Sequence, residues 1–201
     1  MRPVFVVTGP SGAGKGTLIR ALHDRLPDLE VAISATTRPQ RPGEENGREY
    51  WFLTDAEFAA RVAEGAFLEW VAYVSDKRYG TLRSELDRIA GNGRVPVLEL
   101  EPDGALFVQD EVPGTCTIFI AADLDELERR LRERATESTG EIGERIKLAH
   151  HQLEQAFRFR YMVRNDDVMR ASEVLAAIVE RELVLASVGS SVSGGSQTEQ
   201  S

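Results

Sequence analysis

The residues most clearly equipped for chemistry lie near the N-terminus, in the segment Gly9-Pro10-Ser11-Gly12-Ala13-Gly14-Lys15-Gly16-Thr17. An apolar run precedes the segment and an amphipathic stretch follows it, which is the strand, glycine-rich turn and helix of a phosphate-binding loop. Glycines let main-chain N–H groups converge on phosphate oxygens, and the helix N-terminus adds partial positive charge. Lys15 can reach the β- and γ-phosphates of a nucleotide. The alternative is a flexible loop with a surface lysine, which this context disfavours.

The residue after the lysine is Gly16, where such loops usually carry a Ser or Thr whose hydroxyl binds Mg²⁺. Mg²⁺ loses its water reluctantly, so we expect the metal to be held largely by nucleotide phosphates and water. Thr17 and Glu99 are the expected protein contributors, acting through water. Adenylate kinases share this glycine, and the loop alone therefore does not identify the substrate.

A second group of anion-binding residues lies in Ser34-Ala35-Thr36-Thr37-Arg38-Pro39-Gln40-Arg41-Pro42-Gly43-Glu44. Two arginines three positions apart, held by prolines, can converge on one oxyanion because each guanidinium fork fits phosphate oxygens. The hydroxyl of Tyr50 can donate a further bond. In isolation this segment could be a solvated basic loop. Together with the phosphate-binding loop, it implies a donor site and an acceptor site.

The composition is that of a soluble globular protein of 201 residues, with 42% hydrophobic and 28% charged residues. The net charge of −9 argues against a general nucleic-acid binder. Cys116 is the single cysteine and lies in an apolar run, so we expect a buried thiol and a reducing cytoplasmic location. No apolar segment is long enough to span a membrane, and the chain enters its first strand too early for a signal peptide.

Apolar runs alternate with helical patterns along the chain, which predicts an α/β fold with a parallel sheet flanked by helices. The segment 34–81 interrupts this rhythm with turn and strand signals and is predicted to be an inserted mixed lobe. We expect strands at 3–8, 31–34, 50–53, 67–74, 95–100, 117–122 and 161–163. Helices are expected at 15–26, 55–64, 82–91, 124–133, 144–157 and 170–186. The predicted core comprises 1–33, 82–125 and 156–186, with a lid region at 126–155 and a disordered tail at 187–201.

From about residue 3 to 185, these motifs together resemble the guanylate kinase family, whose fold is that of the P-loop nucleoside monophosphate kinases. Phe67-Leu68-Glu69-Trp70 is similar to the family's base-reading motif, and Tyr79-Gly80-Thr81 to the step that completes the pocket. Arg134-Ala135-Thr136-Glu137, with Ile142 and Arg145, resembles the mobile lid. Val163-Arg164-Asn165-Asp166-Asp167 resembles the segment beside the ATP base. The resemblance implies Mg²⁺-dependent transfer of the ATP γ-phosphate to GMP and dGMP.

The resemblance also implies a role for each matching residue. The catalytic residues would be Lys15, Arg38, Arg134 and Arg145. ATP would contact Gly9, Ser11, Gly12, Ala13, Gly14, Lys15, Gly16, Thr17, Arg130, Arg134 and Asn165. GMP would contact Ser34, Arg38, Arg41, Tyr50, Glu69, Tyr79, Thr81, Glu99 and Glu101. The implied partners are ATP and GMP, with no nucleic-acid polymer and no membrane.

Physical reasoning supports the role of Glu69, because one carboxylate can accept bonds from both N1–H and the 2-amino group of guanine. Adenine presents a bare acceptor at N1 and would be disfavoured by several kcal/mol, on the order of other polar mismatches. The alternative for Glu69 is a strand-edge carboxylate in water. Arg130 could serve the lid or could pair with glutamates on its own helix. His23, His150 and His151 are expected on helix surfaces, since phosphoryl transfer to a phosphate needs no catalytic base.

Several residues depart from the family pattern. The segment Glu99-Leu100-Glu101-Pro102-Asp103-Gly104 stands where the family usually has Asp-x-Asp followed by Gln-Gly. Ala135 replaces a lid glycine and is expected to stiffen that turn. Arg164 is expected to point to solvent from an edge strand.

Two other functions fit parts of the sequence. A non-catalytic guanylate-kinase-like module would bind peptides, but such modules typically lose the loop lysine and some arginines, all of which are present here. An enzyme with another acceptor, such as an adenylate kinase or a ribose-bisphosphate kinase, would share the loop without the arginine and Glu69 motifs.

Overall fold

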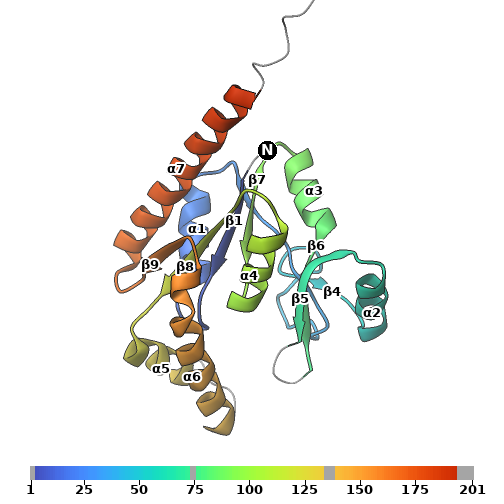
Figure 1. The fold of residues 1–201 in the computed structure, drawn as a ribbon. Helices are drawn as coiled ribbons and strands as arrows, with labels where there is room; N and C mark the ends of the chain where they lie inside the picture. Colours follow the sequence, from blue (N-terminus) through green and yellow to red (C-terminus); the bar gives the residue numbers. More distant parts are fainter. Residues whose placement is uncertain (1–2, 73–75, 134–138, 194–201) are drawn as a thin grey trace, which may run out of the picture. The chain divides into compact units, whose positions relative to one another are not determined.

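The computed structural model describes residues 3–72, 76–133 and 139–193, which form helices and strands in two compact units (Figure 1). The first unit comprises residues up to Pro27 and from Glu99 onward, and the second comprises Asp28–Leu98. The predicted lobe, 34–81, lies inside the second unit. Its exact limits, and those of the lid region, remain predictions.

Three parallel strands form the sheet of the first unit: β1 (Val4–Thr8), β8 (Thr115–Ala121) and β9 (Tyr161–Arg164). β8 pairs with both of the others, with Val6 opposite Thr117 and Ile120 opposite Val163. Every residue of β1 is buried, as expected for a strand covered on both faces.

The helices of the first unit are α1 (Lys15–Arg25), α4 (Pro102–Glu111), α5 (Leu124–Glu133), α6 (Thr139–Glu154) and α7 (Val168–Ser193), with a 3-10 turn at Ala156–Arg158. α4 packs on β1 and β8, while α1 lies beside α7 (Figure 1). The helices therefore shield the apolar strands from water, which is the dominant stabilising contribution to such a unit.

The second unit contains a parallel pair and a mixed sheet. β2 (Leu29–Val31) pairs in parallel with β7 (Val95–Glu99), whose last residue falls in the first unit. The mixed sheet has the order β4 (Trp51–Phe52), β3 (Ala35–Thr36), β6 (Arg78–Leu82) and β5 (Phe67–Ala72). Helices α2 (Asp55–Ala63) and α3 (Arg83–Gly91) complete this unit.

A small apolar core holds the mixed sheet to α2. Phe58 of α2 is fully buried and stacks on Phe67 of β5, with ring centroids 4.4 Å apart. Helix α2 begins with a capping box. The Thr54 hydroxyl accepts a bond from the N–H of Glu57, and the Glu57 carboxylate accepts one from the N–H of Thr54.

The predicted α/β class is confirmed, and the main differences concern element limits. The strand predicted at 31–34 lies earlier, at Leu29–Val31. α4 was not predicted because Pro102 and Gly104 are loop signals, yet Pro102 occupies the first turn, where a proline fits. The tail predicted from 187 is wrong over 187–193, because α7 continues to Ser193. Residues 194–201 lie outside the described part.

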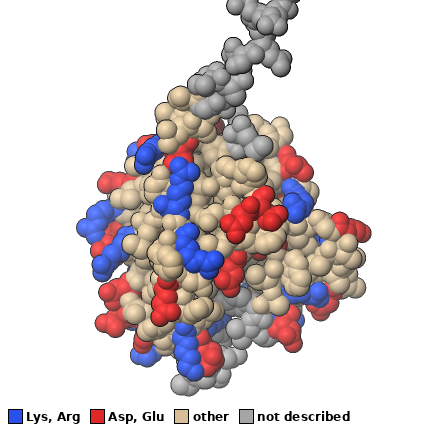
Figure 2. All heavy atoms as spheres, in the orientation of Figure 1, with Lys and Arg blue, Asp and Glu red and all other residues tan. Residues whose placement is uncertain are grey.

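The predicted burial of Cys116 and the predicted surface positions of the three histidines are confirmed. The Cys116 thiol is buried, and burial raises its pKa to about 12. All three histidines are exposed. Basic and acidic side chains are interspersed on the face drawn in Figure 2. Among the described residues, no helix has the length and apolarity needed to cross a membrane.

Candidate functional site

The glycine-rich loop after β1 has a backbone that only glycine tolerates. Gly9, Gly12 and Gly14 have φ values of 138°, 88° and 88°. A Cβ on Gly9 would overlap the carbonyl oxygen of Ile120, and one on Gly14 would overlap the Asn165 amide. The loop therefore passes closer to β8 and to the Asn165 side chain than a residue with a Cβ would allow.

The loop leaves its N–H groups free for an anion. Helix α1 begins after Gly14 without a side-chain cap and without an acidic residue in its first turn. Within the described residues, the N–H groups of Gly12, Gly14, Lys15 and Gly16 donate to no acceptor. Uncapped N–H groups and the helix dipole together favour a bound phosphate.

Lys15 is buried beside this cradle. Its Nζ donates to the carbonyl oxygens of Gly9, at 2.6 Å, and Pro10, at 3.3 Å. The ammonium group is thus held at the loop, where phosphate oxygens can replace the two carbonyls as acceptors.

Two side chains from distant segments support the outer side of the loop. Arg130 on α5 donates from Nη1 to the carbonyl of Gly12, at 3.0 Å, and from Nε to Glu126, at 2.7 Å. Asn165, only 1% exposed, donates from Nδ2 to the carbonyl of Ala13, at 2.8 Å. Arg130 therefore pairs with a glutamate on its own helix, as one alternative had it, and it also contacts the loop; its part in the lid stays a prediction. Asn165 supports the loop backbone, a contact that its predicted place beside the ATP base did not anticipate.

Glu99, the last residue of β7, and Glu101 have different surroundings. A Cβ on Gly16 would lie 3.8 Å from Oε2 of Glu99, which places this carboxylate beside the phosphate-binding loop. Glu101 accepts a bond of 2.8 Å from Nε2 of Gln152, a buried residue of α6 that the sequence analysis did not single out. The only sequence signal for Gln152 is an amide side chain near the end of the predicted lid region, 126–155.

Other predicted residues of this unit are less constrained. Thr17 is exposed, and Ser11 and Arg145 are partly buried. Arg134 and Ala135 lie outside the described residues. In the described parts of the chain, no group of three or more acidic, histidine or cysteine side chains could hold a metal.

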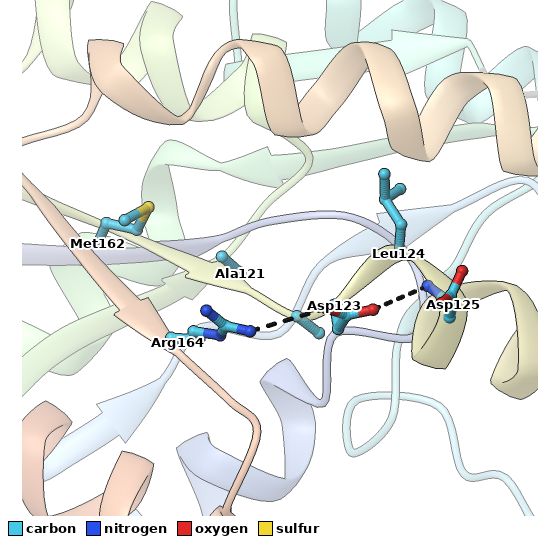
Figure 3. Close-up of a pocket in the computed structure, with 7 residues that line it drawn as sticks. Ala121, Asp123, Leu124, Asp125, Met162 and Arg164 are labelled. Atoms are coloured by element: carbon cyan, nitrogen blue, oxygen red, sulfur yellow. Dashed lines mark hydrogen bonds and ion pairs between the residues drawn. The ribbon is translucent and has the colours of Figure 1, made fainter.

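A shallow hollow of about 500 Å³ lies where β8 and β9 end (Figure 3). It is lined by Ala121, Ala122, Asp123, Leu124, Asp125, Met162 and Arg164. Arg164 reaches Asp123 at 3.7 Å and is mostly exposed, which confirms that it points to solvent. None of the residues predicted to bind a substrate lines this hollow.

In the second unit, Arg38 is held by an internal carboxylate. Its two terminal nitrogens donate to Glu44 at 2.8 and 3.0 Å, and Glu44 also accepts from the N–H of Arg41 at 2.8 Å. Glu44 raises the pKa of Arg38, and Arg38 in turn lowers the pKa of Glu44. Glu44 was missed as a partner, although it lies three residues after Arg41 in the same turn-rich segment.

Aromatic rings surround the guanidinium of Arg38. It lies 5.3 Å from the ring centroid of Tyr50, and the rings of Tyr50 and Tyr79 are 6.0 Å apart. The structure therefore brings Arg38, Tyr50 and Tyr79 together. Arg41 extends an exposed side chain, and Ser34 is partly buried.

Glu69 on β5 is a buried acid, so its interpretation as a solvated strand-edge residue is wrong. Its Oε1 accepts bonds of 2.9 Å from both the N–H and the hydroxyl of Thr81, and the residue is 8% exposed. Burial raises its pKa despite these bonds. Its Oε2 accepts no bond from the described residues and is not fully enclosed. One carboxylate oxygen is thus fixed while the other stays available to a ligand.

The loop geometry makes Gly9→Ala strongly destabilising. The added methyl group overlaps main-chain atoms of β8 that cannot rotate away, and φ of 138° is itself unfavourable for alanine. We expect a loss of about 3 kcal/mol or more in the free energy of unfolding. Urea denaturation checks this, with Gly91→Ala as the control because a Cβ there meets open space. Equal midpoints for the two variants would contradict the steric argument.

The fold and the loop define a class of proteins, the P-loop nucleoside monophosphate kinases. The structure resembles the crystal structure of guanylate kinase from Anaplasma phagocytophilum, with a TM-score of 0.72 and 23% identity over 90% of this chain and 86% of that one. The guanylate kinase family model matches residues 1–182. The chain belongs to the guanylate kinase family.

Individual relatives agree with this assignment. The chain is 43% identical over 180 residues to the guanylate kinase of Caldanaerobacter subterraneus subsp. tengcongensis, covering 89% of this chain and 87% of the relative. It is 44% identical over 179 residues to that of Rubrobacter xylanophilus, covering 89% and 93%. The match therefore spans both units and nearly the whole of each relative.

Proposed function

We propose that this protein transfers the γ-phosphate of ATP to GMP, and also to dGMP, producing ADP and GDP or dGDP in the cytoplasm. The observation that carries the choice of acceptor is the Glu69 carboxylate, which Thr81 holds by one oxygen while the other stays available. Two adjacent donors on guanine match this acceptor, whereas adenine has none at N1. Family membership supports the same substrate.

The donor site is the loop with its free N–H groups. They bind the ATP phosphates, and Lys15 neutralises charge that develops on the transferred group. Arg134 and Arg145 are proposed to add positive charge and exclude water when the lid closes. Arg130 and Asn165 contribute by holding the loop carbonyls outward, which keeps the N–H groups directed inward.

Mg²⁺ fits this site as an ion that arrives with the nucleotide. The available donors are oxygens, which Mg²⁺ prefers: the exposed hydroxyl of Thr17 and the Glu99 carboxylate beside Gly16. When bound, the ion would neutralise charge on the β- and γ-phosphates. Thr17 and Glu99 would hold it through water, since the described residues offer no complete protein cage.

The proposed acceptor residues of the second unit lie within Asp28–Leu98, while Glu99 and Glu101 of the first unit stay predicted GMP contacts. The GMP phosphate is proposed to be held by the side chains of Arg38, Arg41, Ser34, Tyr50 and Tyr79. An oxygen of that phosphate attacks the γ-phosphorus, and the bond to the ADP oxygen breaks. Because the attacking oxygen is already anionic, positioning and charge neutralisation suffice.

Release of ADP in the presence of different acceptors tests the proposal. We expect rapid release with GMP and dGMP and at least about a hundredfold lower kcat/KM with AMP. Equal turnover of AMP and GMP would contradict the assignment of Glu69. Binding of GMP with no ADP release for any acceptor would instead indicate a non-catalytic module.

A further inference from the structure

Glu85, in the first turn of α3, is a buried acid outside the set of residues assigned above. Its side chain is 4% exposed. Its Oε2 accepts the main-chain N–H of Ile33 at 3.0 Å, and its Oε1 accepts the indole N–H of Trp51 at 3.2 Å. One carboxylate therefore joins two segments that are 18 positions apart in the sequence.

These two contacts lie at the two ends of residues 34–50, which we call the acceptor segment because they include Ser34, Arg38, Arg41 and Tyr50. Ile33 immediately precedes Ser34, and Trp51 immediately follows Tyr50. The ends also meet directly, because the N–H of Trp51 donates to the carbonyl of Ser34 at 2.9 Å. The intervening chain carries Arg38 and Arg41 and is rich in turns. The contacts that join its two ends therefore help to determine where these side chains lie.

The charge of Glu85 is compensated within the same unit. Arg88, one turn along α3, donates to Oε1 at 3.2 Å and to Oε2 at 2.9 Å. Arg88 also pairs with Glu30 of β2, four residues before Ser34. These bonds hold the pKa of Glu85 below its usual range, against the opposing effect of burial. A neutral amide cannot replace this arrangement, because its NH₂ group would face donors from Ile33 or Trp51.

We infer that Glu85 is a positioning residue for the acceptor site, fixing the ends of segment 34–50 so that Ser34, Arg38 and Tyr50 face one ligand. This inference rests on the proposed function. It goes beyond that function because it assigns a role to Glu85, which is not among the residues proposed to contact ATP or GMP. Its loss should weaken GMP binding while leaving ATP binding and the chemical step unchanged.

Steady-state kinetics of Glu85→Gln tests this inference, with both substrates varied. We expect KM for GMP to rise about tenfold or more, while kcat and KM for ATP change less than about twofold. Trp51→Phe removes one of the two tethers and leaves the carboxylate, so it should raise KM for GMP about threefold. Asp87→Asn, an exposed acid on the same helix, is the control and should match the wild type.

The outcomes separate this inference from the proposed function. An unchanged KM for GMP in both Glu85→Gln and Trp51→Phe would overturn the positioning role while the wild type still phosphorylates GMP. A fall in kcat with KM for GMP unchanged would also overturn it, because that is the signature of a general structural role. If the wild type itself does not phosphorylate GMP, the proposed function fails and the inference fails with it.

Discussion

Replacing Lys15 by alanine is expected to lower kcat by about a thousandfold while the affinity for GMP stays unchanged. Lys15 Nζ lies 2.6 Å from the carbonyl oxygen of Gly9, inside the phosphate-binding loop. Removing a buried cation from a preorganised site takes away charge stabilisation that water cannot replace. The residues proposed to hold the GMP phosphate and to read its base belong to the second unit, which does not include Lys15.

Single-turnover phosphoryl transfer and GMP titration calorimetry measure the two effects separately. Lys147→Ala is the matched control, because Lys147 is exposed and, among the described residues, its ion pair is with Glu144 on its own helix. Lys15→Arg retains the charge but not the shape of the ammonium group, and should recover little activity. Wild-type rates in Lys15→Ala would remove this residue from the mechanism.

The second large effect is expected for Glu69→Gln, which should lower kcat/KM for GMP by about a hundredfold. The amide can still accept both bonds from Thr81 through its oxygen, so β5 and β6 remain joined. Its NH₂ group would then face the two donors of guanine, which replaces two attractive contacts by repulsive ones. The ratio of kcat/KM for GMP to kcat/KM for AMP should fall as well.

The same substitution should stabilise the folded protein at neutral pH. Burial raises the pKa of Glu69 above its unfolded value, so the ionised form costs folding free energy at pH values above the folded pKa. We expect Glu69→Gln to gain about 1 kcal/mol at pH 7. This advantage should shrink as the pH falls from the folded pKa toward the ordinary value of a glutamate, because the wild type then becomes neutral as well.

Acceptor kinetics and urea denaturation at several pH values check both halves of this prediction. Glu64→Gln serves as the control, because Glu64 is exposed at the end of α2 and should change neither quantity. A variant that keeps its preference for GMP would refute the guanine-reading role. A variant less stable than the wild type at pH 7 would show that the ionised carboxylate contributes more bonding than burial costs.

Local sequence patterns predicted the parts of the site that depend on short-range geometry. The glycines of the loop and the cap at Thr54 could be predicted because each follows from backbone conformation within a few residues. The burial of Glu69 could be inferred only from its motif. A single carboxylate has no periodic signal that tells a pocket from a strand edge.

The contacts that were not predicted join residues far apart in the sequence. Asn165 reaches Ala13 across 152 positions, and Gln152 reaches Glu101 across 51. Such pairs depend on how helices and strands pack, and no pattern along one segment encodes them. Glu44 is a different case, since it is near Arg38 in sequence but its carboxylate could equally have faced water.

The carboxylate of Glu44 acts as a tethered counter-ion for Arg38, and this has a consequence for selectivity. An attached competitor is present at a high effective concentration, so a small free anion such as sulfate gains little by displacing it. Under the proposed function, a mononucleotide would add the interactions of its base with Glu69 and would compete far better. We therefore expect Glu44 to disfavour the binding of small inorganic anions at Arg38 relative to that of a mononucleotide.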